Sequence, residues 1–146
     1  MKLWQSLLLV SFAFLVSCNS GPKKSSADES KEFNAYMDQV FDEVLSYSPE
    51  GMTYFGKKDK YGQLDDRTEA HAQKMMEINK RVLAKMKDFN YDNLDTQAKL
   101  TYDLAKMDGE HAIEDFKWRD YGYSINQQEG IHSSLPSFMI NMHRVE

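Results

Sequence analysis

Apolar residues recur at steps of three and four along most of this chain, and this spacing constrains the fold more than any other feature. It is clearest from Phe33 to Leu45, where apolar residues form one broad face and Asp38 and Asp42 lie off it. A repeat near 3.6 residues is that of an amphipathic α-helix, and no stretch alternates as a half-buried strand does. We therefore predict an all-α fold whose first long helix covers residues 33–45.

The same spacing predicts a short helix or turn and then a second long helix. The run Ser48-Pro49-Glu50 restarts the chain, because proline is tolerated in a first helical turn, and Gly56 is available as the stop. The second long helix opens near Asp66 or Thr68. Its apolar face consists of His71, Met75, Ile78, Val82, Met86 and Phe89.

A third long helix is capped by Asp95 or Thr96. We expect its main buried stripe to consist of Leu100, Leu104, Met107, His111 and Trp118, widened by Tyr102, Ile113 and Phe116. Gly109 lies inside this helix, where glycine costs about 1 kcal/mol relative to alanine. We expect that glycine stands at this position because the helix packs closely against a neighbour there.

The start of the chain has the features of an exported lipoprotein. Lys2 is the only charge before an apolar run from Leu7 to Val16, which is too short to span a bilayer. Residues 1–17 therefore read as a signal peptide. The run Leu15-Val16-Ser17-Cys18 matches the bacterial lipobox, which predicts that Cys18 is lipidated and anchors the protein to the membrane.

Residues 18–31 contain too few apolar side chains to fold alone, so we expect a flexible tether there and a helical domain over 32–146. Asn19 stands directly after the cysteine, where an aspartate could stand, and in this the chain resembles lipoproteins that are sorted onward to the outer membrane. The expected location is thus the bacterial cell envelope, lipid-anchored at the outer membrane and facing the periplasm.

The net charge limits the kinds of binding partner, and the cysteine content limits what can stabilise the fold. With Cys18 as its single cysteine, the chain has no internal disulfide available, so an apolar core must stabilise it. The formal net charge of −5 does not favour binding to nucleic acid or to anionic lipid.

The stretch from Tyr121 to His143 gathers polar groups where the third helix ends. Asn126, Gln127 and His132 are the candidates for contact with a substrate or partner, since binding residues often lie on loops held by a rigid scaffold. The alternative is a structural crossover whose amides satisfy the backbone. Beyond it, Ser134 can cap a last helix with Pro136 in its first turn.

One pair of side chains has a spacing that can hold metal. His111 and Glu114 lie three residues apart on one helical face, a near miss to an inverted zincin motif. The alternative is a packed histidine beside a glutamate that faces water. Because the chain has no His-Glu-x-x-His helix, no phosphate-binding loop and no Gly-x-Ser-x-Gly elbow, we assign it no catalytic residue, metal ligand or cofactor.

The order of several short motifs resembles a known family. These motifs are Phe41-Asp42 with Leu45, Pro49-Glu50 with Thr53 and Gly56, Leu100-Thr101-Tyr102-Asp103-Leu104, and Asn126-Gln127 with Gly130, His132 and Leu135-Pro136. Together they resemble the N-terminal quarter of the bacterial domain-of-unknown-function family 885. The resemblance implies a large helical, exported zinc metallopeptidase related to the gluzincins, in which a His-Glu motif and a later glutamate bind zinc. None of those ligands can be placed in this chain.

The resemblance also predicts that the chain is one part of a larger fold. The pattern reaches the family's His-x-Val at His143-Arg144-Val145, and Glu146 follows within an expected helix. We therefore expect an N-terminal fragment of a metallopeptidase-like lipoprotein, inactive alone, whose full-length form binds a peptide substrate. The alternative is a stand-alone, membrane-anchored helical module that binds a periplasmic partner.

Overall fold

The computed structural model describes residues 25–123, 125–128 and 130–143. Within these ranges the α-helices are α2 (Ser26–Ser46), α3 (Pro49–Tyr54), α4 (Glu69–Met86), α5 (Thr96–Asp115) and α6 (Ile131–Asn141), and the 3-10 helices are η1 (Tyr91–Asn93) and η2 (Phe116–Tyr121). The described chain contains no strand, only an isolated bridge between Ile125 and Gly130. The all-α prediction is confirmed. The predicted signal peptide and Cys18 lie outside the described residues.

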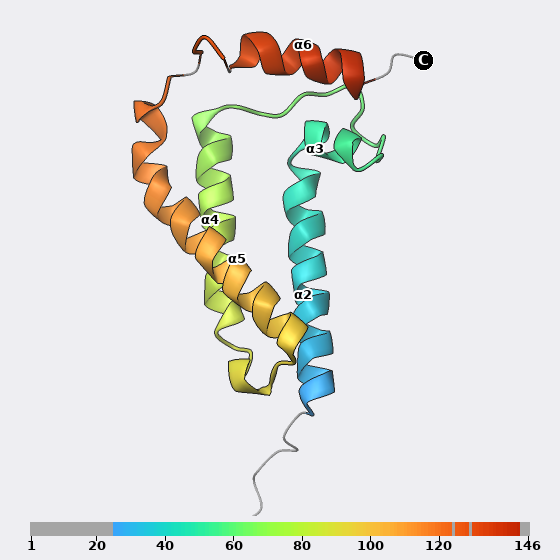
Figure 1. Ribbon diagram of the computed structural model, residues 1–146, viewed down its shortest axis with the longest axis vertical. Coiled ribbons are helices and arrows are strands. Elements are labelled where there is room, and N and C mark those ends of the chain that lie inside the picture. The colour runs from blue at the N-terminus through green and yellow to red at the C-terminus, as the bar shows by residue number, and fades with distance from the viewer. Residues whose placement is uncertain (1–24, 124, 129, 144–146) are drawn as a thin grey trace, which may run out of the picture.

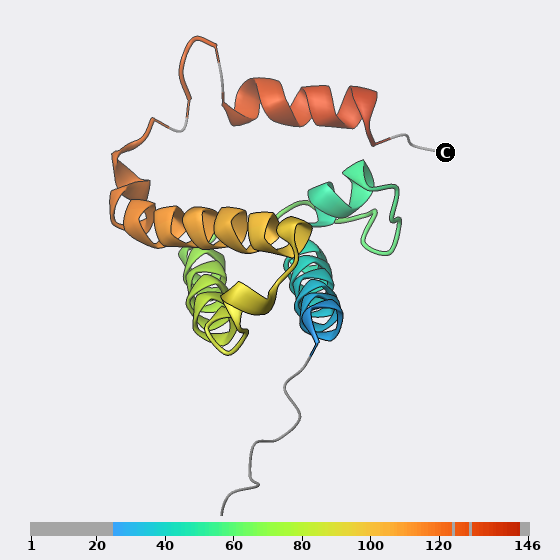
Figure 2. The same ribbon diagram turned by 60° about the horizontal axis from the view of Figure 1, so that its bottom comes forward.

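The helices form a pair crossed by a third. Figure 1 shows α2 and α4 running side by side along the long axis, with α5 crossing them diagonally, and Figure 2 shows α5 lying over both. The short α3 sits at the end of α2, and α6 runs across that end of the molecule. In the part of the chain that the structure describes, no helix is long and apolar enough to cross a membrane.

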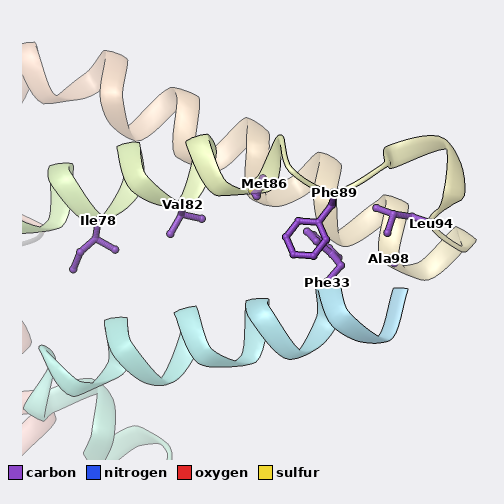
Figure 3. Packing of buried hydrophobic residues seen from close by; sticks show 7 residues of the cluster. All are labelled: Phe33, Ile78, Val82, Met86, Phe89, Leu94 and Ala98. Atoms are coloured by element: carbon purple, nitrogen blue, oxygen red, sulfur yellow. The ribbon is translucent and has the colours of Figure 1, made fainter. Parts of the chain in front are cut away.

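The core lies where α2, α4 and the start of α5 converge. It contains Phe33, Ile78, Val82, Met86, Phe89, Leu94 and Ala98, as Figure 3 shows. The ring of Phe33 meets that of Phe89 edge-on at 5.3 Å and that of Tyr102 at 5.6 Å. The predicted apolar face of the first long helix is buried at Phe33 and Leu45, whereas Phe41 is 49% exposed. The predicted face of the second is confirmed from Ile78 to Phe89.

The first helix begins earlier than the composition indicates. Ser25 caps α2 by accepting a hydrogen bond from the Asp28 N–H at 3.2 Å, so residues 26–31, which we expected to be tether, are helical. Glu29 and Ser30 are only 6% and 2% exposed, because both point into the molecule and bind the chain between α4 and α5. The tether prediction is wrong over these residues, since low apolar content does not reveal buried polar anchors. The rest of the expected tether, up to Lys24, lies outside the described residues.

The third long helix packs by the face opposite to the expected one. Gly109 and Ala98 are buried on α5, and a Cβ on Gly109 would lie 3.1 Å from side-chain carbons of Leu83 on α4. The expected close packing at Gly109 is confirmed. The prediction that Leu100, Leu104 and Met107 form the buried stripe is wrong, because small residues let α5 approach α4 more closely than those long side chains could.

The last helix starts before the predicted cap. Ser133 and Ser134 both donate their backbone N–H to the carbonyl of Gly130, at 3.0 and 2.9 Å, so α6 begins at Ile131 and Pro136 lies inside it. Gly130 has φ 148°, a conformation that side chains disfavour, and so it breaks the chain more sharply than Ser134 could. Phe138 is buried against Tyr54, with ring centroids 5.5 Å apart, which joins α6 to α3.

Candidate functional site

The loop predicted to contact a ligand is exposed at the end of η2. Asn126, Gln127 and His132 all face solvent, and the side chain of Asn126 accepts a hydrogen bond from the Gln128 N–H at 2.8 Å. The loop is closed by the bridge between Ile125 and Gly130, and His132 follows in the first turn of α6. Asn126 and Gln127 thus lie within one closed turn, and His132 lies directly after it. Contact of these residues with a substrate or partner stays a prediction.

The spaced pair His111 and Glu114 does not form a metal site. Both are exposed on α5, and Glu114 pairs with Lys117 at 3.5 Å. A zinc site in a protein takes three or four protein ligands, and over the described ranges no group of three or more His, Cys, Asp or Glu side chains could hold an ion. The expectation that Glu114 faces water is confirmed. The alternative of a packed histidine is wrong, because His111 faces solvent as well.

The structure instead gathers apolar side chains on the outer face of α5. We call Leu100, Leu104, Met107 and His111 the α5 stripe. Its three apolar members are 52%, 48% and 46% exposed. Trp118, 55% exposed, lies on η2 at the end of the same helix. Large side chains repeated along one solvent-facing line are unusual on a monomer and are typical of an interaction face.

Carboxylates border the α5 stripe on both sides. By helical spacing, Asp103 and Glu110 lie along one edge, and Asp108 and Asp115 lie along the other; all four are exposed. The hydroxyl of Tyr91 donates to Asp103 at 2.9 Å, and this hydrogen bond raises the pKa of Tyr91. The result is an apolar line between two acidic borders.

Polar contacts at both ends of α5 hold the stripe outward. At the start, the Asp95 N–H donates to the Ser30 hydroxyl at 2.8 Å. Beyond the end, Arg119 on η2 donates to both carboxylate oxygens of Glu69 on α4, at 2.8 and 3.1 Å, and these bonds lower the pKa of Glu69. The helix is thereby fixed against α2 at one end and α4 at the other.

A second polar cluster, which sequence reasoning missed, closes the turn before α4. Asp65 accepts hydrogen bonds from the Ser48 hydroxyl and the Glu50 N–H, each at 3.0 Å, while Glu50 accepts from the Asp65 N–H at 3.1 Å. Arg67 pairs with Glu50 at 2.9 Å. These groups satisfy one another and the start of α3, so the cluster is structural. No local pattern could reveal it, because its members are separated by the polar loop after α3.

The comparisons with known proteins cover the motifs from Pro49 onward, while the first motif, Phe41-Asp42 with Leu45, precedes the matched residues. The family model described as "Bacterial protein of unknown function (DUF885)" matches residues 49–146. The chain belongs to the DUF885 family. No curated protein and no solved structure matches it.

The DUF885 match contains both candidate surfaces but not the whole core. It begins at the first residue of α3 and includes the α5 stripe and the loop around Gln127. The preceding helix α2 contributes Phe33, which is fully buried, and the two polar anchors Glu29 and Ser30. In this DUF885 member, therefore, α2 is a structural part of the domain although it precedes the matched region.

Proposed function

We propose that this chain is the N-terminal part of an exported lipoprotein that resembles a zinc metallopeptidase, and that it is inactive as a peptidase by itself. In this proposal it is a scaffold on which the catalytic part of the fold is assembled. The observation that carries the proposal is the α5 stripe on a member of the DUF885 family.

The α5 stripe supports a scaffold role through the free energy of burial. Fully burying a Leu or Met side chain stabilises a fold by about 1.5–3 kcal/mol. Leu100, Leu104 and Met107 are about half exposed, so close to half of this free energy of burial is not gained, while Ala98 and Gly109 on the same helix are buried. A further element that covers the stripe would recover the difference, so the face suits a permanent neighbour in a larger fold.

The anchor and the binding residues belong to the same proposal. Cys18 carries the lipid that holds the protein in the cell envelope, at the outer membrane and facing the periplasm. In the full-length form, Asn126, Gln127 and His132 contact the peptide substrate. Their exposure on a closed turn beside η2 supports this role.

Zinc is expected in full-length relatives, but the described residues do not fit it. His111 and Glu114 supply only two ligands on an exposed helix face, and Glu114 already pairs with Lys117. A catalytic zinc needs three protein ligands and an open position for water. We therefore place no catalytic step on this chain.

The zinc content of the purified protein tests the inactivity. We expect well under one equivalent of zinc and no difference between wild type and His111→Ala, with His71→Ala on α4 as the matched control. Zinc near one equivalent that is lost in His111→Ala and kept in His71→Ala would overturn the proposal and assign a site to α5.

A second candidate is a stand-alone anchored module that binds a periplasmic partner. The observation in its favour is the exposure of Tyr121 and Tyr123, 77% and 92%, beside the loop around Gln127, because tyrosines are enriched at interfaces. A module of this kind is soluble, monomeric and cooperative in unfolding. A scaffold fragment instead binds apolar dyes and aggregates, so these properties separate the two candidates.

A further inference from the structure

We infer that the α5 stripe docks one amphipathic helix whose own apolar line is flanked by Lys and Arg, contributed by the rest of the metallopeptidase-like fold. The inference rests on the proposed function and adds the chemistry of the covering element. Three features of α5 carry it: the spacing of the stripe, the sign of its borders and its orientation on the core.

The spacing of the stripe fits a helix. Leu100, Leu104, Met107 and His111 follow one another at steps of four, three and four. This is the spacing of the two seam positions of a heptad, which pack into the gaps of a facing helix at a crossing angle of about 20°. A strand or an irregular loop would not match a line of this period.

The borders determine the charge of that helix. In the same heptad register the positions next to the seam are Asp103 and Glu110 on one side and Asp108 and Asp115 on the other. Charged residues at these positions form salt bridges between paired helices and so determine which helices pair. Glu110 pairs with Lys106 at 4.0 Å and Asp103 accepts from Tyr91, so the border of Asp103 and Glu110 is partly neutralised, whereas Asp108 and Asp115 form no ion pair among the described residues. Basic residues on the covering helix would therefore face carboxylates along both edges.

The same charges disfavour the other occupants. Two copies joined through this face would set acidic borders against acidic borders, and like charges at these positions destabilise helix pairs. An anionic membrane surface would be repelled for the same reason.

Trp118 offers a direct readout of docking. The chain has two tryptophans, and Trp4 lies in the predicted signal peptide, so the mature chain reports from Trp118 alone. The probes are two synthetic helical peptides of about four heptads with leucine in the seam. One carries lysine beside the seam and the other carries glutamate. We expect the lysine peptide to shift Trp118 emission to shorter wavelength and to bind at least about tenfold more tightly than the glutamate peptide.

Variants separate docking from general charge attraction. Leu104→Ser should weaken binding of the lysine peptide at least about tenfold. Asp108→Asn with Asp115→Asn should weaken it severalfold, whereas the matched control Asp38→Asn with Asp59→Asn, on α2 and in the loop after α3, should leave it unchanged.

Several results would overturn the inference. These are equal binding of the two peptides, no binding of the lysine peptide, lysine-peptide binding that Leu104→Ser leaves unchanged, and a dimer of the chain that Leu104→Ser dissociates. The dimer would also remove the observation that carries the proposed function. The other three results do not bear on that function, because the zinc content and the covering of the stripe by an uncharged helix are separate questions.

Discussion

Glu29 and Ser30 are the residues on which the placement of α5 depends. Each lies on α2 and accepts a backbone N–H from the connection between α4 and α5: Glu29 from Asn90 at 2.9 Å and Ser30 from Asp95 at 2.8 Å. Because this connection returns the chain across α2, these two bonds set where α5 begins. They also explain why a polar stretch is part of the folded domain.

Removing the Glu29 carboxylate should therefore destabilise the domain. Glu29→Ala leaves the Asn90 N–H without its acceptor, and an unsatisfied, partly buried donor costs about 1–3 kcal/mol. Glu77→Ala is the matched control on α4, since its exposed pair with Lys80 should contribute less than about 0.5 kcal/mol. Urea unfolding of both variants measures the difference. Equal losses of stability would show that Glu29 is a surface residue.

At Cys18 the prediction concerns a covalent anchor. Expressed in a bacterial host, the wild-type protein should incorporate labelled palmitate and partition into detergent, because several acyl chains on one cysteine hold it firmly in a bilayer. Cys18→Ser should do neither. Equal labelling of the two proteins would exclude lipidation at this residue.

Among the elements, α5 carries the clearest separation of faces. The face with Ala98 and Gly109 packs on the core, and the face with the α5 stripe lies in solvent. Replacing Leu100, Leu104 and Met107 together by Gln should leave the stability of the domain within about 1 kcal/mol and reduce the binding of an apolar dye. Circular dichroism and dye fluorescence measure the two effects.

The opposite face supplies the control for this triple variant. Ala98→Leu inserts extra carbon atoms at a position with no exposed surface and should cost about 1–3 kcal/mol. If the triple variant unfolds while Ala98→Leu folds normally, then the orientation of α5 is the reverse of the one described.

Local signals predicted the elements better than their packing. Two of the three predicted caps are confirmed, since Thr68 caps α4 and Asp95 caps α5, each accepting a backbone N–H three residues on, whereas Ser134 lies inside α6. The stop at Gly56 is also real, with φ 73° and hydrogen bonds from Gly56 to Thr53 and from Lys57 to Met52. Such features depend on neighbouring residues, so a sequence reveals them.

The face that α5 buries could not be predicted in the same way. Apolar periodicity identifies Leu100, Leu104 and Met107 as one line, but it does not say whether that line covers this core or a neighbour outside it. Gly109 decides the question, because it allows the close approach to Leu83 on α4, and Ala98 is buried in the core on the same face. Gly109 was the available signal. If the buried face of α5 is centred on Gly109, the sequence predicts the face that the structure shows.

In the whole molecule, the inner faces of the helices form the core and the outer face of α5 stays exposed. Phe33, Met86 and their neighbours bury the inner faces of α2, α4 and the start of α5 into one core. The outer face of α5 and the loop around Gln127 remain exposed at the surface. A domain with a closed core and an apolar outer line is suited to form one part of a larger helical protein.

The nucleotide sequence that follows the codon for Glu146 tests this account most directly. The account predicts that the reading frame, or a frame restored by a single shift, continues into helices that include a His-Glu zinc motif and a later glutamate. It also predicts at least one amphipathic segment with lysine or arginine beside its apolar line. A stop codon followed by unrelated sequence would contradict the account and favour the stand-alone module.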